Sequence, residues 1–472
     1  MIPFSATSLL HTLTPLLLAS AEAAEQGGGQ SGASLIQTKL ATLPMAGMFS
    51  LIAFAFLATL IVSKLSTRVG IPAILGVLLL GVIVTPDAAI LSPEGAETLH
   101  VVSLSMLLFY AGLSSNFTNL RQLLGYGLLL AVGGVMVSSV LFAAGIWVIS
   151  HGTGSLVPGG VGLPLSVCFL VASCLGSTDA GATLSVLRSV RRLVPPHIKT
   201  LVEFESSIND PAAILFLLLV IGLSTQTAGQ DVDSIHSIAI QIQTFLKSIG
   251  SGIMVGLILT YVAQFILNSV LTSRDQVLVV GMSLAMASYG ISTLLGGSGY
   301  ITAFVTGAFL SNNIYKNPYI TPELVENSLE PFNTMMELVV FMLFGLLFDP
   351  SKLTSYILPG VLMSLMLMFI ARPLSVIVFK PFSSLNQRET ALVCWCGLRG
   401  AVPLALSYSV IHSLPQISGI TAEQARLIGE EVQNLIFVIV VTNLCLQGFS
   451  LPKVCRWLGF RELSDAQLAA SN

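Results

Sequence analysis

Long apolar segments, separated by short polar connections, follow one another along almost the whole chain. A helix needs about 20 mostly apolar residues to cross the hydrocarbon core of a bilayer. Candidate segments lie at 45–63, 70–86, 97–113, 124–150, 163–188, 199–223, 238–270, 276–291, 294–312, 331–348, 355–380, 388–412 and 432–451. The eighth and ninth are divided only by a glycine-rich turn at 296–299. The pattern predicts an all-α polytopic membrane protein with about 13 transmembrane helices.

The composition agrees with a lipid-facing surface. Charged residues make up 9% of the 472 residues and hydrophobic residues 54%, which excludes a water-soluble protein of this size. The net charge of −3 provides no basic surface for nucleic acid. The six cysteines form no CxxC pair and the six histidines are scattered, so we expect buried thiols, no metal cluster and no cofactor.

The N-terminal region differs from the rest of the chain. Residues 7–24 form an apolar stretch that is short for a span and ends in small residues. We interpret residues 1–25 as a signal peptide and 26–44 as a polar extracytoplasmic segment. The usual basic n-region is missing, so an uncleaved helix is an alternative. The transmembrane domain then covers 45–455, and 456–472 form a short cytoplasmic tail.

Lysine and arginine are distributed asymmetrically over the connections. With the mature N-terminus outside, 14 of the 20 basic residues fall on the cytoplasmic side and three fall outside. This is the distribution that the positive-inside rule requires. We therefore predict a multi-pass protein of a bacterial plasma membrane with its N-terminus outside and its C-terminus in the cytoplasm. The remaining three basic residues, Lys247, Arg372 and Arg399, lie within spans.

The sixth span holds the densest group of polar residues inside the predicted membrane region. On a helix, Glu205 and Asn209 are i,i+4 neighbours, and so are Ser206 and Asp210. Pro211 removes a backbone donor and so frees a carbonyl one turn earlier. Carboxylate, hydroxyl and amide oxygens are the ligands of hard cations such as alkali ions. The group therefore predicts a cation site; the alternative is a polar network that only holds helices together.

Two further spans are interrupted by glycines around one charged residue. In the fifth, STDAGAT (177–183) places Asp179 in an otherwise apolar helix, and in the twelfth, GLRGAVPLAL (397–406) does the same with Arg399. Broken helices at corresponding positions of two halves indicate the binding site of a transporter. They fit two inverted six-helix repeats, spans 1–6 and 8–13, in which spans 5 and 12 are broken crossing helices. We expect Arg399 to be the counter-ion of Glu205, because a buried acid needs one.

Four motifs in order, STDAGAT, ESSINDP (205–211), ARPLSV (371–376) and GLRGAVPLAL, resemble those of the monovalent cation:proton antiporter-1 family, the NhaP-type bacterial exchangers. The resemblance covers roughly residues 45–455. It implies a transporter, not an enzyme, that exchanges Na+ or K+ for protons and serves pH homeostasis. It also implies a homodimer in which a six-helix core moves against a scaffold domain in an elevator-like motion.

The resemblance also implies roles for individual residues. A proton and a cation compete for Asp210, and Glu205 forms a structural ion pair with Arg399. Arg372 matches a second intramembrane arginine of the family. The Asn-Asp form of the sixth-span motif implies electroneutral 1:1 exchange. The expected cation- and proton-binding residues are Asp210, Asn209, Ser206, Thr178 and Asp179, with Na+ or K+ held by Asp210, Ser206 and Thr178.

Two other functions use the same residues. A cation channel would need a continuous pore with rings of filter carbonyls, and the sequence has no repeated filter-like segment. An intramembrane hydrolase could use Asp179 and Asp210 as an acid/base dyad, although the asparagine and arginine companions favour ion binding. The choice among Na+, K+ and Li+ is left open, because oxygen ligands serve all three.

Overall fold

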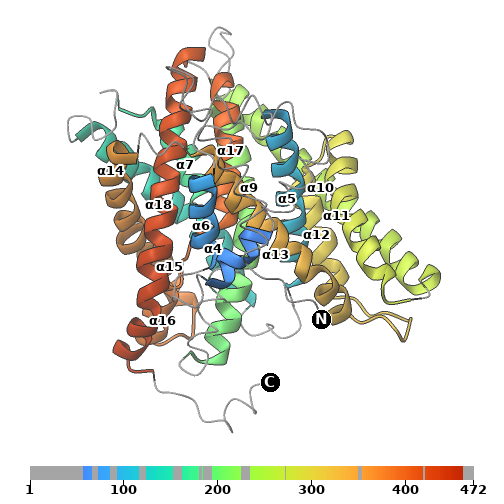
Figure 1. The fold of residues 1–472 in the computed structure, drawn as a ribbon. Coiled ribbons are helices and arrows are strands. Elements are labelled where there is room, and N and C mark those ends of the chain that lie inside the picture. Colours follow the sequence, from blue (N-terminus) through green and yellow to red (C-terminus); the bar gives the residue numbers. More distant parts are fainter. Residues whose placement is uncertain are drawn as a thin grey trace, which may run out of the picture.

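The computed structural model describes residues 57–65, 73–84, 93–115, 124–152, 162–179, 183, 194–224, 234–271, 273–348, 353–417 and 420–460. Every regular element within these ranges is a helix (Figure 1). The predicted signal peptide at 1–25 and the polar segment at 26–44 lie outside the described residues, as does the tail beyond Phe460.

The helices follow the predicted apolar segments. A helical stretch at 57–65 precedes the labelled elements. These are α4 (Ala73–Val84), α5 (Pro93–Leu113), α6 (Leu124–Gly152), α7 (Leu165–Cys174), α9 (Pro196–Ser224), α10 (Ser234–Phe265), α11 (Gln276–Leu294), α12 (Gly299–Ser311), α13 (Pro322–Leu347), α14 (Leu353–Met366), α15 (Arg372–Phe379), α16 (Gln387–Trp395), α17 (Ala401–Ser413) and α18 (Ala422–Trp457).

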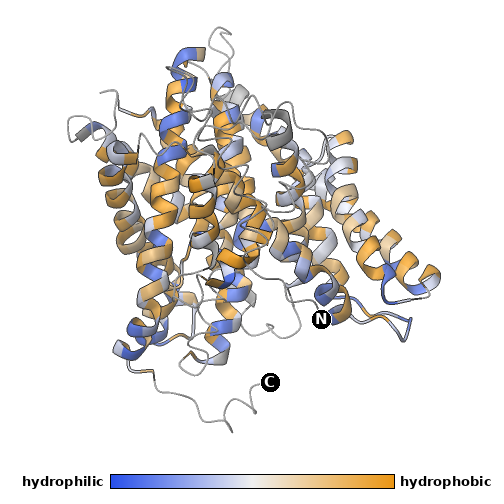
Figure 2. Cartoon of the chain, in the orientation of Figure 1, coloured by the Kyte–Doolittle hydropathy of each residue, from blue (hydrophilic) through white to orange (hydrophobic). Residues whose placement is uncertain are grey.

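Helix length and composition confirm a polytopic membrane protein. In the described ranges, seven helices are long and apolar enough to cross a bilayer, and three apolar helices are shorter. Figure 2 shows apolar residues along the helices and polar residues concentrated toward their ends. The exact count of 13 spans and the orientation in the membrane stay predictions.

Three predicted interruptions are present. The chain leaves α11 at Leu294 and enters α12 at Gly299, through a turn in which Gly296 has a φ of +73° that favours glycine. The fifth span is broken after α7, where residues 177–179 are not helical. The twelfth is broken between α16 and α17, at 397–400. Broken fifth and twelfth spans are therefore confirmed; of the second half of the fifth span, the structure describes only Thr183.

The helices pack in two groups. One contains α4, α5 and α10 to α13, in which α12 packs on α5 and α13 packs on α4. The other contains α6, α7, α9 and α14 to α18, in which α14 packs on α18 and α6 on α9. In Figure 1, α10 and α11 lie at one side of the molecule and α14 and α18 at the other, with α9 and α17 between them. A boundary between the two groups thus passes beside α9 and α17.

Glycine pairs let the helices of the first group touch at their backbones. A Cβ atom on Gly81 of α4 would lie 2.8 Å from the Cα atom of Gly345 in α13. A Cβ atom on Gly112 of α5 would overlap the carbonyl oxygen of Phe304 in α12, and Gly307 meets Phe109 in the same way. Such close crossings are typical of small residues in membrane helices, and they fix α5 and α13 in place.

Helix α13 begins earlier than the apolar segment predicted at 331–348. The hydroxyl of Thr321 accepts a hydrogen bond from the backbone nitrogen of Leu324 at 3.2 Å and caps the helix. Glu326 and Glu330 are therefore helical, and they extend the same helix face as residues nearer the membrane centre.

Candidate functional site

The two broken spans meet at their interruptions. The backbone nitrogen of Asp179 donates to the carbonyl oxygen of Leu398 at 2.8 Å. Nη1 of Arg399 donates to the carbonyl oxygens of Gly176, at 2.7 Å, and Ser177. These are backbone groups that helix bonds would otherwise occupy. At the crossing, backbone groups that have left their helices therefore find hydrogen-bond partners inside the protein.

Charged side chains at the crossing match the ends of the half-helices. The Asp179 carboxylate accepts a 3.0 Å hydrogen bond from the backbone nitrogen of Ala401, the first residue of α17. Arg399 donates to the carbonyl oxygens of Gly176 and Ser177, which follow the C-terminal end of α7. Helix dipoles favour a negative group at the N-terminus and a positive group at the C-terminus. The charges of Asp179 and Arg399 thus interact favourably with the backbone groups of the interruptions.

A second network joins α9 to the fifth-span interruption. The Asn209 amide oxygen accepts from the backbone nitrogen of Thr178 at 3.2 Å, and its Nδ2 atom donates to the Thr178 hydroxyl at 2.5 Å and to Glu205 at 3.3 Å. The hydroxyls of Thr178 and Ser206 are 3.0 Å apart. The structure thus brings together four of the residues selected from the sequence, with their polar groups directed at one another.

Glu205 is paired with Arg372, not with Arg399 as we predicted from the sequence. Nη1 and Nη2 of Arg372 donate to the two carboxylate oxygens of Glu205 at 2.7 and 2.9 Å. Glu205 and Arg372 are 1% and 4% exposed, so both charges are buried. Arg372 is the first residue of α15 and follows the π-helical turn Leu367–Ala371. The predicted Glu205–Arg399 pair is wrong because Arg399 is used by carbonyl groups of the crossing.

Asp210 stands apart from both networks. Its side chain is 6% exposed, and its Oδ1 atom has no hydrogen-bond partner among the described residues. Asp179, Ser177, Glu205 and Arg399 are near enough to act on its charge. A buried carboxylate oxygen without a partner is costly, so its presence inside a membrane helix marks a functional group.

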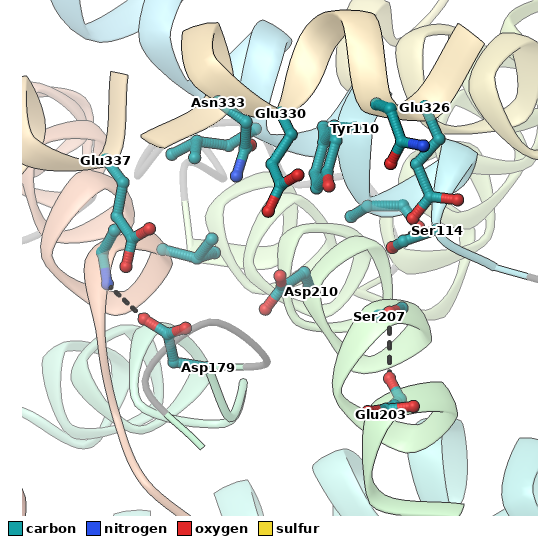
Figure 3. Close-up of a pocket in the computed structure, with 15 residues that line it drawn as sticks. Tyr110, Ser114, Asp179, Glu203, Ser207, Asp210, Glu326, Glu330, Asn333 and Glu337 are labelled. Atoms are coloured by element: carbon teal, nitrogen blue, oxygen red, sulfur yellow. Dashed lines mark hydrogen bonds between the residues drawn. The ribbon is translucent and has the colours of Figure 1, made fainter. Parts of the chain in front are cut away.

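A cavity of about 400 Å³ gives access to Asp210. It lies between the two groups of helices, with α5 and α13 on one side and α9 and the start of α17 on the other (Figure 3). Its lining contains no lysine or arginine. Six of the lining side chains are acidic: Asp179, Glu203, Asp210, Glu326, Glu330 and Glu337. A concave cavity whose charged side chains are all acidic attracts cations and repels anions.

The cavity acids form stripes on two helices. On α9, Glu203, Ser207 and Asp210 have the i, i+4, i+7 spacing of one helix face. On α13, Glu326, Glu330, Asn333 and Glu337 continue the same spacing over three turns. We call these four residues the α13 stripe. Glu326 and Glu330 were missed by the sequence analysis because they precede the apolar segment predicted at 331–348. Their spacing is the signal that would have found them.

The sequence matches a known protein family and is similar to several antiporters. Residues 52–457 match the family model of the transmembrane sodium/hydrogen exchanger. The K(+)/H(+) antiporter NhaP2 of Shewanella sp. (strain ANA-3) is 28% identical over 407 residues, which are 84% of this chain and 64% of that relative. The low-affinity Na(+)/H(+) antiporter NhaS1 of Synechocystis sp. is 27% identical over 314 residues, 63% of this chain and 54% of that relative.

A solved structure shares the fold. The sodium proton antiporter MjNhaP1 from Methanocaldococcus jannaschii superposes with a TM-score of 0.72 at 20% sequence identity, over 88% of this chain and 99% of that one. The match to the sequence relatives spans less than two thirds of their length, with 64% for NhaP2. The likeness in fold and sequence therefore extends over the helical region that contains the cavity and the crossing.

Proposed function

Because the chain belongs to the sodium/hydrogen exchanger family, we propose that it exchanges a monovalent cation, Na+ or K+, for protons through Asp210. The similar proteins are described as K+/H+ and Na+/H+ antiporters. The observation that carries the proposal is the Asp210 carboxylate, which is buried, lines the acidic cavity and has no partner for Oδ1 in the described part of the chain.

Competition at one carboxylate couples the two ions. When Asp210 is ionised, it attracts a cation from the cavity; when it is protonated, it does not. The neighbouring charges are already balanced, because Glu205 is paired with Arg372 and Asp179 lies at the start of α17. Asn209 next to Asp210 is neutral. The site then carries either one proton or one cation, and exchange is 1:1 and electroneutral.

Alternating access follows from the position of the site. Asp210 lies on α9, in one group of helices, whereas α5 and α13 of the other group wall the cavity. An elevator-type displacement of the first group against the second would carry Asp210 from one membrane face to the other. In this proposal the protein works as a homodimer whose fixed parts include α5 and α13. Thr178 and Ser206 contribute oxygens to the cation beside Asp210.

The contacts of Asp179 favour this function over a hydrolytic dyad. An acid/base pair needs two carboxyl groups that both reach the substrate. The Asp179 carboxylate is committed to the backbone nitrogen of Ala401. Of these two carboxylates, Asp210 is the one that lines the cavity with an oxygen that has no partner among the described residues.

The test is ion-driven proton movement in proteoliposomes that contain an internal pH dye. External Na+ or K+ is expected to alkalinise the interior, whereas choline is not. Asp210→Asn should give no response, because an amide neither binds the proton nor attracts the cation. Asp275→Asn, the same change at an exposed residue before α11, is the matched control. Exchange by the Asp210→Asn protein, or no response of the wild type to any alkali cation, would overturn the proposal.

A further inference from the structure

Glu337 is the innermost residue of the α13 stripe. It occupies the middle of α13, between Met336 and Leu338, and lines the same cavity as Asp210. Its carboxylate points from α13 toward the α17 end of the cavity, where Asp179 lies (Figure 3). An ionisable residue at this depth is expensive and is by default a functional group.

Among the residues that the structure describes, Glu337 has no structural partner that would explain a carboxylate at this depth. It forms no hydrogen bond or ion pair with another described residue, in contrast to Glu205 with Arg372 and Asp179 with Ala401. If Glu337 only filled space, the protein would be more stable with leucine or glutamine at this position. We therefore expect this carboxylate to bind a ligand that enters the cavity.

Other uncommitted oxygens belong to residues that line the same cavity. Asp210 is 6% exposed and its Oδ1 atom lacks a partner, and the buried Oδ1 atom of Asn333 also lacks one among the described residues. Asp210 projects from α9, and Asn333 and Glu337 project from α13 on the opposite wall. A partly dehydrated alkali cation requires oxygen ligands around it and no neighbouring positive charge. The cavity has oxygen atoms on two walls and no basic side chain in its lining.

We propose that Glu337 is a second carboxylate ligand of the transported cation, reaching from α13 to the ion that Asp210 holds from α9. This inference rests on the proposed exchange function and adds a residue to its site. The proton balance stays 1:1. Without a cation, Asp210 and Glu337 each carry a proton; the cation displaces one proton into the cavity water, and the other proton stays on the pair. The occupied and the empty pair are then equally neutral.

Glu337 also makes the cation affinity of the exchanger different on the two sides of the membrane. It belongs to the helix group of α5 and α13, whereas Asp210 belongs to the group of α9. A relative displacement of the two groups separates the carboxylates, so Glu337 binds the cation only while this cavity is open. It therefore sets the cation affinity on the side to which the cavity opens.

The experiment compares Glu337→Gln with the wild type in proteoliposomes, with KM for Na+ and K+ measured separately from the maximal rate. Loss of a ligand should raise KM about tenfold while the maximal rate changes less than about twofold. Glu337→Asp keeps the carboxylate and should give a KM between the two. Glu323→Gln, an exposed glutamate on the first turn of α13 outside the cavity, is the matched control and should behave as the wild type.

A binding measurement keeps the test decisive if Glu337→Gln is inactive. The cation concentration that half-maximally stabilises the purified protein against thermal unfolding reports binding without transport. A rise of about tenfold supports the inference; an unchanged value, or an unchanged KM with a lower maximal rate, overturns it. A wild-type protein that exchanges no cation would instead overturn the proposed function itself.

Discussion

The Glu205 carboxylate and the Arg372 guanidinium form a two-bonded ion pair with donor–acceptor distances of 2.7 and 2.9 Å. The pair connects α9 to the start of α15 one turn away from Asn209, which also donates to Glu205. Nη2 of Arg372 is also 3.4 Å from the carbonyl oxygen of Val393 in α16. Three helices of one group are thus held together immediately beside Asp210.

Removing either partner of this pair should destabilise the protein. Glu205→Gln and Arg372→Ala each leave one buried group uncompensated, at a cost of roughly 3–5 kcal/mol. The double variant should be little worse than the worse single variant, because the uncompensated charge is then absent. Thermal unfolding of the purified variants in detergent measures these differences.

Arg399 provides the control for this prediction. Its side chain binds the carbonyl groups of Gly176 and Ser177, so Arg399→Ala combined with Glu205→Gln should give additive losses. Strong coupling of Glu205 to Arg399, with additivity toward Arg372, would contradict the assignment of the pair.

Gly400 is required at the crossing because it leaves space for Asp179. A Cβ atom at residue 400 would overlap the Asp179 carboxylate, so Gly400→Ala should displace it from the backbone nitrogen of Ala401 and lower exchange by about tenfold or more. Gly290→Ala, at a helical glycine with no atom near the added carbon, is the matched control. Ion-driven proton movement measures both.

The cause of the Gly400 effect can be isolated with a second substitution. Asp179→Ala removes the carboxylate that the methyl group would meet. If the overlap is the cause, Gly400→Ala should add little loss in the Asp179→Ala background. An equal loss in both backgrounds would show that the glycine is needed for another reason.

The sequence predicted those parts of the fold that follow from local composition. Apolar length located the helices, and glycines beside a single charge located both interruptions, because such residues disfavour a continuous membrane helix. The residues around Asp210 were found for the same reason, since polar side chains inside an apolar segment are conspicuous. The structure adds that Thr178, Ser206 and Asn209 bond to one another, whereas Asp210 faces the cavity.

The sequence did not predict which residues form ion pairs or which residues line the cavity. Arg372 and Arg399 both lie within spans, and only their positions in space decide which one meets Glu205. Local patterns carry no information on that choice, because Arg372 and Arg399 are both far from Glu205 along the chain. Glu326 and Glu330 were missed for another reason: an apolar window ends where polar residues begin, although α13 continues through them.

The charge arrangement around Asp210 predicts that exchange is insensitive to membrane voltage. Moving one net charge across the membrane couples transport to voltage by about 2.3 kcal/mol per 100 mV, roughly a 50-fold change in the equilibrium ratio of the ions. Here Glu205 is paired with Arg372, and Asn209 is neutral. Asp179 accepts a hydrogen bond from the N-terminus of α17, and Arg399 donates to carbonyl groups of the fifth-span interruption. Proteoliposomes on a solid-supported membrane should therefore give no transport current after a cation jump, with Asp210→Asn as the background. A sustained current in the wild type that Asp210→Asn lacks would show that net charge crosses the membrane with the site and would contradict electroneutral 1:1 exchange.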